Sequence, residues 1–248
     1  MKITLLTIFP GMCEAVLQES ILGRARKAGT LDVRVVDIRP FSDAKHKNTD
    51  DYPFGGGAGM LMTPQPIASA FQAVCGEHFS GKRIFLGPCG VPFDQKLAEE
   101  LSREEELVLL CGHYEGVDQR ALDHYIDLEI SLGDFILTGG ELAALAVTDC
   151  IARLLPGVLG SDESAVDESF SADGLLEYPQ YTRPRVFEGE EVPPVLLSGD
   201  HAKIAAWRRR QSVLKTARLR PDLLEKASLT DEERKAAAAL SENGCLPE

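Results

Sequence analysis

Apolar residues in the first two-thirds of the chain form short runs that alternate with longer amphipathic segments. The runs Ile3–Ile8 and Leu107–Leu110 are unbroken or nearly so, which is typical of buried strands. The same pattern predicts further strands at 31–38, 83–86 and 126–130. It predicts helices at 12–28, 64–75, 94–101, 117–124 and 141–155. Alternation of this kind indicates an α/β fold with a mostly parallel sheet and helices on both faces.

The pattern changes after Gly160. Residues 161–174 are rich in Ser, Asp, Glu and Ala, with few large apolar side chains, so we predict a mobile linker there. A helical pattern follows at His201–Leu219, and Thr230–Glu233 reads as a capping box that opens a last helix. We therefore predict an α/β domain at 1–160 and a small, mostly helical domain at 175–248, joined by the linker at 161–174.

The charge of the chain is unevenly distributed. The 248 residues carry a net charge of −13, which by itself argues against binding to nucleic acid. The segment His201–Arg220, however, contains seven Lys and Arg side chains and no acid. A local basic patch can steer RNA to a protein that is acidic overall.

The spacing of the cysteines and histidines bears on the redox compartment of the protein and on metal binding. The six cysteines include no Cys-x-x-Cys pair, and the five histidines show no metal-ligand spacing. This favours reduced thiols in the cytoplasm and no metal site. The apolar run Ile3–Phe9 is too short for a signal sequence or a membrane span, so we expect no membrane attachment.

Several glycine-rich loops follow the predicted strands. They lie at Gly55–Gly59, Gly87–Gly90, Gly112–Gly116 and Gly133–Gly140. Neither a Gly-x-Gly-x-x-Gly turn into a helix nor a phosphate-binding Gly-x-x-x-x-Gly-Lys-Ser/Thr motif occurs. Glycine lets the backbone approach a ligand closely, and ligands of open α/β sheets bind beyond the carboxyl ends of the strands. We therefore expect one pocket lined mostly by backbone.

Six ordered motifs carry a family resemblance that covers nearly the whole chain. They are Tyr52–Met60, Cys111–Gly116, Ser131–Glu141, Pro156–Gly160, Tyr178–Pro184 and Val192–Gly199. Together they resemble the bacterial tRNA (guanine-N1)-methyltransferases. The resemblance implies methylation of N1 of the guanosine just 3′ of the anticodon (position 37) with S-adenosylmethionine. It also implies a deep trefoil knot and a homodimer whose active site is shared between subunits. The family is described as assisted by magnesium, and no motif in this sequence locates such an ion.

The resemblance also assigns residues to ligands. For the cofactor it implies Leu86, Gly87, Pro88, Gly90, Gly112, Tyr114, Glu115, Leu132, Gly133, Asp134, Phe135, Ile136, Leu137, Gly139 and Gly140. For the target guanine it implies Asp50 and Glu115, whose carboxylates can accept from the N1 and N2 donors. We expect Arg208, Arg209 and Lys215 to contact tRNA, although consecutive arginines on a helix cannot all face one way. The family often has arginine in place of His113, so the resemblance leaves the role of this position open.

Methylation of N1 requires removal of its proton, and the resemblance places the base in the linker. The family has an aspartate immediately before Ser-Phe; here Glu168 precedes Ser169-Phe170, and Asp167 is a rival one residue earlier. From composition alone both would be solvated linker acids. Arg153 by itself would complement the dipole at the end of its helix, and the resemblance makes it the electrostatic partner that either holds O6 or orients the base.

Three other functions fit the sequence less well. They are methylation of a ribose 2′-hydroxyl or another base, RNA binding without catalysis, and methylation of a small molecule, which the net acidity would suit.

Overall fold

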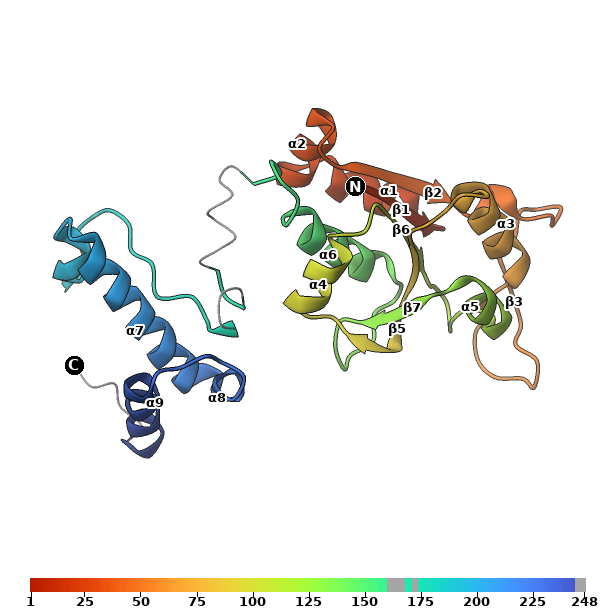
Figure 1. Ribbon diagram of the computed structural model, residues 1–248. Coiled ribbons are helices and arrows are strands. Elements are labelled where there is room, and N and C mark those ends of the chain that lie inside the picture. The colour runs from red at the N-terminus through yellow and green to blue at the C-terminus, as the bar shows by residue number, and fades with distance from the viewer. Residues whose placement is uncertain (160–167, 171–173, 244–248) are drawn as a thin grey trace. The chain divides into compact units, whose positions relative to one another are not determined.

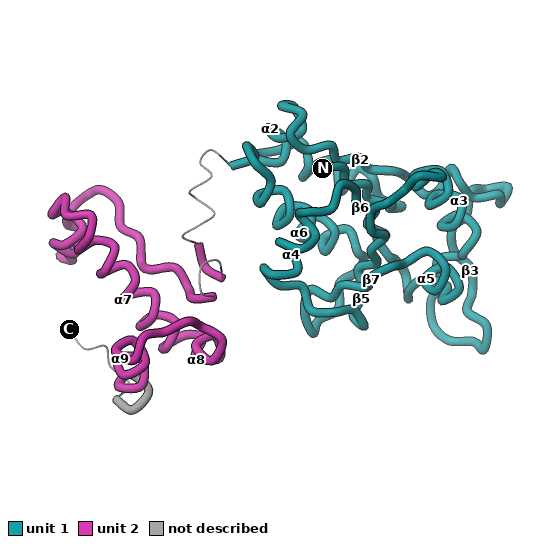
Figure 2. The backbone as a smooth tube through the Cα atoms, in the orientation of Figure 1, with its two compact units in different colours: residues 1–162 teal, residues 163–248 magenta. Residues whose placement is uncertain are grey.

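The chain forms two compact units in a computed structural model that describes residues 1–159, 168–170 and 174–243. Residues 1–162 make up the first unit and residues 163–248 the second (Figure 2). Ten residues of the predicted linker, 161–167 and 171–173, lie outside the described part of the chain. Each unit is therefore considered by itself.

The first unit is built on a five-stranded sheet in the order β2-β1-β6-β5-β7 (Figure 1). All its pairings are parallel, as the alternating pattern predicts. The strands are β1 (Lys2–Thr7), β2 (Asp32–Asp37), β5 (Lys82–Pro92), β6 (Glu106–Cys111) and β7 (Leu128–Ser131).

Helices cover both faces of this sheet. Side chains alternate along β6, so Leu107 and Leu109 join one core while Val108 and Leu110 join the other. The first core is shared with α1 (Pro10–Leu17), α2 (Ser20–Ala28), α4 (Gln95–Leu101) and α6 (Glu141–Ala152). The second is shared with α3 (Pro64–Cys75) and α5 (Gln119–Tyr125). The predicted α/β sandwich of helices around a parallel sheet is confirmed.

Two elements differ from the prediction. The helix predicted at 12–28 is broken into α1 and α2, with Ser20 at φ 51° beside the break. Gly23 permits this packing, because a Cβ there would lie 2.1 Å from the carbonyl oxygen of Gln18. Strand β5 continues beyond Leu86, because the chain bulges at 87–90 and then resumes pairing. Leu86 and Val91 both stand opposite Ile130 as a result.

The long loop predicted at 39–62 contains only short elements. They are a 3-10 turn, Arg39–Phe41, and two paired two-residue strands, β3 (Asp50–Asp51) and β4 (Leu61–Met62). The backbone N–H of Met62 donates to the carbonyl of Gly116 at 2.9 Å, which ties this loop to the segment after β6.

The second unit packs around α7 (His201–Leu219), which has the bounds predicted from sequence. It also contains β8 (Val186–Phe187), β9 (Glu190–Glu191), a 3-10 turn at Pro194–Leu197, α8 (Pro221–Leu224) and α9 (Asp231–Asn243). Its core includes Leu175, Val213 and Leu214. The predicted capping box is confirmed: Thr230 N–H donates to Glu233 at 2.8 Å, and Glu233 N–H donates to the Thr230 hydroxyl at 3.3 Å. Across the described residues, none of the helices is long and apolar enough to pass through a membrane.

Candidate active site

A pocket of about 350 Å³ lies beyond the ends of β6 and β7 and beside the bulge of β5. Parallel strands bring the loops that follow them to one edge of the sheet, so the three glycine-rich segments meet there. The lining residues are Phe85, Leu86, Gly87, Pro88, Gly112, His113, Tyr114, Glu115, Gly116, Ile130, Ser131, Leu132, Gly133, Phe135, Ile136, Leu137, Thr138, Gly139, Gly140 and Ala143.

Glycine is required at two points in this wall. The N–H of Gly140 donates to the carbonyl of Gly112 at 2.8 Å, so the two loops touch along their backbones. A Cβ on Gly140 would lie 2.8 Å from the Cα of Cys111, and one on Gly112 would lie 2.9 Å from the Phe85 ring. Larger residues at either position would push the loops apart and change the shape of the pocket.

Most residues expected to bind the cofactor line this pocket, but two do not. Gly90 packs against the backbone of β7, where a Cβ would lie 2.4 Å from Glu129 C, and Asp134 is exposed to solvent. Sequence analysis did not assign several residues that do line it: Phe85, His113, Gly116, Ile130, Ser131, Thr138 and Ala143. These residues flank the assigned motifs, so their closeness in sequence to the glycines could have predicted their place in the pocket.

The segment after β6 brings the predicted guanine-binding residues together. Tyr114 adopts φ 60°, and its hydroxyl donates to Asp50 at 3.4 Å. Partial burial, followed by the nearby Asp50 carboxylate, raises the pKa of Tyr114. Glu115 N–H donates to Met60 O at 3.0 Å, and a Cβ on Gly59 would lie 2.4 Å from Glu115 Cγ. Asp50 and Glu115 thus belong to one hydrogen-bonded group of loops at the pocket.

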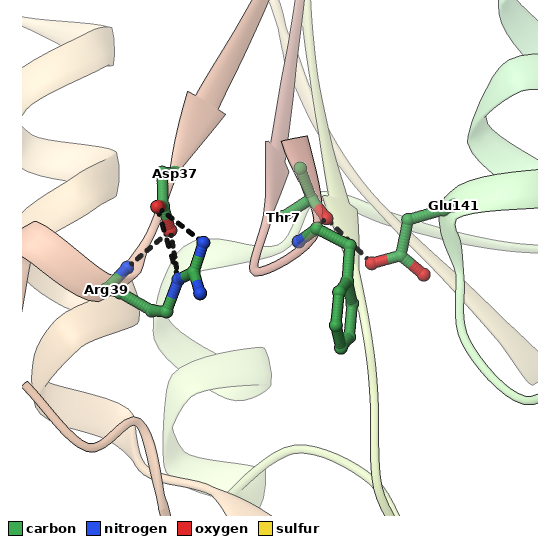
Figure 3. A network of polar contacts seen from close by, with 5 residues as sticks. Thr7, Asp37, Arg39 and Glu141 are labelled. Carbon is green, nitrogen blue, oxygen red and sulfur yellow. Dashed lines mark hydrogen bonds and ion pairs between the residues drawn. The ribbon is translucent and has the colours of Figure 1, made fainter. Parts of the chain in front are cut away.

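A buried carboxylate lies directly after the glycines of the pocket wall and joins them to β1. Glu141, the first residue of α6, is 2% exposed and accepts a 2.7 Å hydrogen bond from the hydroxyl of Thr7 (Figure 3). The same hydroxyl accepts from the N–H of Phe9 at 2.8 Å. The ring of Phe9 in turn lies 4.7 Å from that of His113. Figure 3 also shows Arg39 bound to Asp37 on the neighbouring strand, where one of its nitrogens lies 3.0 Å from the carboxylate.

Cys111, the last residue of β6, is buried next to Gly112 of the pocket wall. Its hydrogen bond with Cys13, together with burial, raises the pKa of the Cys111 thiol well above its usual range. A raised pKa keeps the Cys111 thiol protonated, and a protonated thiol is a poor nucleophile.

The predicted catalytic residues belong to different units. Arg153 caps the end of α6 in the first unit, and its N–H donates to Asp149 O at 3.1 Å. Glu168 lies in the second unit, whereas Asp167 lies outside the described residues. The segment after Glu168 is folded back: Phe170 N–H donates to Leu175 O, and Glu177 N–H donates to the Ser169 hydroxyl, both at 2.9 Å.

Several basic residues of α7 make contacts within the second unit. Arg209 pairs with Glu233 at 2.7 Å, and the Lys215 ammonium donates to Glu177 O at 2.8 Å. The guanidinium of Arg208 lies 4.7 Å above the ring of Tyr178. Arg210 and Arg218, which we did not assign to tRNA, are exposed. Within the described ranges, no three His, Cys, Asp or Glu side chains are grouped so as to hold a metal ion.

Comparison with known proteins identifies the family. Residues 1–226 match the family model described as tRNA (Guanine-1)-methyltransferase TrmD. The chain is 59% identical over 235 residues to a tRNA (guanine-N(1)-)-methyltransferase of Clostridium perfringens, covering 95% of this chain and 98% of the relative. It is 53% identical over 234 residues to the protein of that name from Geobacillus kaustophilus, covering 94% and 96%. The chain therefore belongs to the tRNA (guanine-1)-methyltransferase family.

Proposed function

We propose that this enzyme methylates N1 of guanosine 37, the nucleotide 3′ of the anticodon, and takes the methyl group from S-adenosylmethionine. The observation that carries the proposal is the glycine-lined pocket at the carboxyl ends of β6 and β7 and the bulge of β5, in a chain of the tRNA (guanine-1)-methyltransferase family. The family's trefoil knot is part of the proposal for the first unit.

The pocket suits S-adenosylmethionine in size and chemistry. Its volume of about 350 Å³ falls within the range of small-molecule sites. Leu132, Ile136 and Leu137 offer apolar surface for the adenine ring, and backbone groups near Gly112 and Gly140 offer hydrogen bonds to its edge. When bound, the cofactor supplies a methyl group on a sulfonium, which is reactive enough to need no covalent enzyme intermediate.

Asp50 and Glu115 are the proposed contacts for the target guanine. A carboxylate accepts hydrogen bonds from both the N1–H and the N2 amino group, a donor pair that adenine lacks. Glu115 is exposed beside the pocket, and the hydrogen bond from Tyr114 orients Asp50. This arrangement would select guanine over adenine.

Glu168 is the proposed general base, with Asp167 as its rival, and Arg153 the proposed partner of O6. Loss of the N1 proton places negative charge on the N1–C6–O6 system, which a guanidinium stabilises. Glutamate stands where the family has aspartate, and its extra methylene extends its reach. We propose that tRNA binding brings this carboxylate to the pocket, where exclusion of water makes it a stronger base.

We further propose that the enzyme is a cytoplasmic homodimer with a shared active site. The apolar side chains of α6 pack mostly in the core of the first unit, so they leave little surface for a dimer interface. Exposed apolar residues nearby offer a surface instead: Phe9, Met12, Val16 and Leu142 are each 42–49% exposed. Light scattering at micromolar concentration should give twice the monomer mass.

For tRNA, the exposed Arg210 and Arg218 of α7 are now stronger candidates for phosphate contacts than Arg209 and Lys215, which have partners inside the unit. Transfer of a labelled methyl group to bulk tRNA, followed by nucleoside analysis, tests the proposed function. We expect 1-methylguanosine as the product. A 2′-O-methyl nucleoside, another methylated base or no transfer to RNA would contradict it.

A further inference from the structure

Two large aromatic side chains stand in solvent on the glycine-rich loop between β3 and β4. Phe54 is 101% exposed and Tyr52 is 79% exposed, the former as open as an isolated side chain. Figure 1 shows the segment beside β3 reaching away from the sheet and its helices. Single exposed apolar residues are common, but two on one short loop beside an active site indicate a binding surface.

The backbone of this loop is anchored at both ends. Its ends pair as β3 and β4, with Asp50 opposite Met62 and Asp51 opposite Leu61. It is also bound to the segment after β6, because Glu115 N–H donates to Met60 O. Between these anchors the glycines adopt positive φ, which L side chains rarely adopt; they are Gly55, Gly56, Gly57 and Gly59. Tyr52 and Phe54 thus lie on a loop that begins next to Asp50 and whose far end, at Gly59 and Met60, contacts Glu115.

The chemistry of the substrate explains what such rings would bind. N1 lies on the Watson–Crick edge of guanine, and an enzyme that reacts with this edge takes the base out of its stack. Removal leaves the neighbouring bases without a stacking partner. Proteins that bind unpaired RNA supply aromatic side chains for this purpose, because every nucleobase has a flat face that stacks on them.

We propose that Tyr52 and Phe54 form a stacking platform for the nucleobases that flank the target guanine. The inference rests on the proposed function, since it takes guanosine 37 as the target. It assigns the loop a role in holding RNA, separate from the cofactor pocket and from proton transfer.

The test uses the full-length enzyme and an anticodon stem–loop RNA with 2-aminopurine at the position before or after the target. Stacking on an aromatic ring keeps 2-aminopurine fluorescence low. We expect low fluorescence with the wild type, Phe54→Trp and Tyr52→Phe, and higher fluorescence with Phe54→Leu and Tyr52→Leu. The leucine variants keep apolar bulk but lose the aromatic face, so they isolate stacking from simple burial.

The same variants should change catalysis in a specific way. Loss of one stacked base should raise KM for the RNA by about 5- to 150-fold, with S-adenosylmethionine affinity by calorimetry unchanged. Wild-type fluorescence and KM in both leucine variants would overturn the platform. A changed mass in light scattering with unchanged fluorescence would also overturn it, because the rings would then belong to a subunit interface. The fluorescence readout needs no methyl transfer, so failure of the proposed function is seen separately, as a wild type that does not methylate guanosine 37.

Discussion

Thr7 and Glu141 are 134 residues apart in the chain, yet their side chains share a buried 2.7 Å hydrogen bond that joins the end of β1 to the start of α6. Both are almost fully buried. The bond fixes α6 behind the pocket, since Gly139 and Gly140 immediately precede Glu141.

Replacing Thr7 with valine should destabilise the fold. It keeps the shape but leaves a buried carboxylate oxygen and the Phe9 N–H without their partner, at a cost of about 1–3 kcal/mol. The matched control is Thr148→Val, because the Thr148 hydroxyl on α6 is buried with no hydrogen-bond partner among the described residues. Urea denaturation should show a clear loss for Thr7→Val and little change or a gain for Thr148→Val. Equal effects would mean that the Thr7–Glu141 bond contributes nothing specific.

Gly140→Val should abolish S-adenosylmethionine binding while the fold persists. The added side chain would clash with the backbone of Cys111 and push the loop at Gly140 away from the loop at Gly112. Gly11→Ala is the control, because its Cβ would meet no atom within 4 Å. Calorimetry should find no binding to Gly140→Val and wild-type affinity in Gly11→Ala; binding by both would place the cofactor elsewhere.

Lys215→Met should slow methyl transfer without changing cofactor affinity. The Lys215 ammonium holds Glu177, whose N–H donates to Ser169 next to the proposed base. Lys203→Met is the control, because Lys203 is exposed and pairs with Asp200, three residues before it on the same helix end. We expect a lower single-turnover rate for Lys215→Met alone. A change confined to tRNA affinity would instead make Lys215 an RNA contact, as the sequence analysis proposed.

Stability of the second unit should fall in acid because of Glu233. Hydrogen bonds from Arg209 lower the pKa of Glu233 below its ordinary 4.5. A carboxylate whose pKa is lower in the folded state stabilises the fold fully at pH values above its pKa in the unfolded state. That stabilisation is lost as the pH falls through the pKa of the folded state. Glu233→Gln should therefore be less stable than wild type at pH 7, with the difference shrinking below about pH 4.5. Urea midpoints between pH 7 and 3.5 measure this; a difference that stays constant with pH would contradict it.

Local patterns predicted the fold well, and long-range contacts account for what they missed. The bounds of α7 and the capping box of α9 follow from residues close in sequence, so they were predictable. The break after Leu17 was not, because Gln18 and Glu19 favour helix and the break depends on how Gly23 packs against Gln18. The return of β5 to pairing at Val91 depends on its neighbour β7.

In the site, too, local sequence patterns predicted some features and long-range contacts decided others. Glycine-rich loops after strands predicted a pocket, and the parallel sheet explains why those loops converge. Sequence could not show that Arg209 and Lys215 bind partners within the second unit. Their partners, Glu233 and Glu177, lie 24 and 38 residues away in the chain, so local patterns do not reveal these contacts. Nor could it show that Thr7 supports the start of α6.

Single-turnover methyl transfer to a tRNA transcript with guanosine at position 37 tests the central claim most directly, with wild type, Glu168→Gln and Asp167→Asn compared side by side. Glutamine keeps the size of Glu168 but cannot take the N1 proton. We predict 1-methylguanosine at position 37 with the wild type, a rate about 10²–10⁴-fold lower for Glu168→Gln, and a much smaller loss for Asp167→Asn. The reverse order would make Asp167 the base, and unchanged rates in both variants would contradict the proposed mechanism.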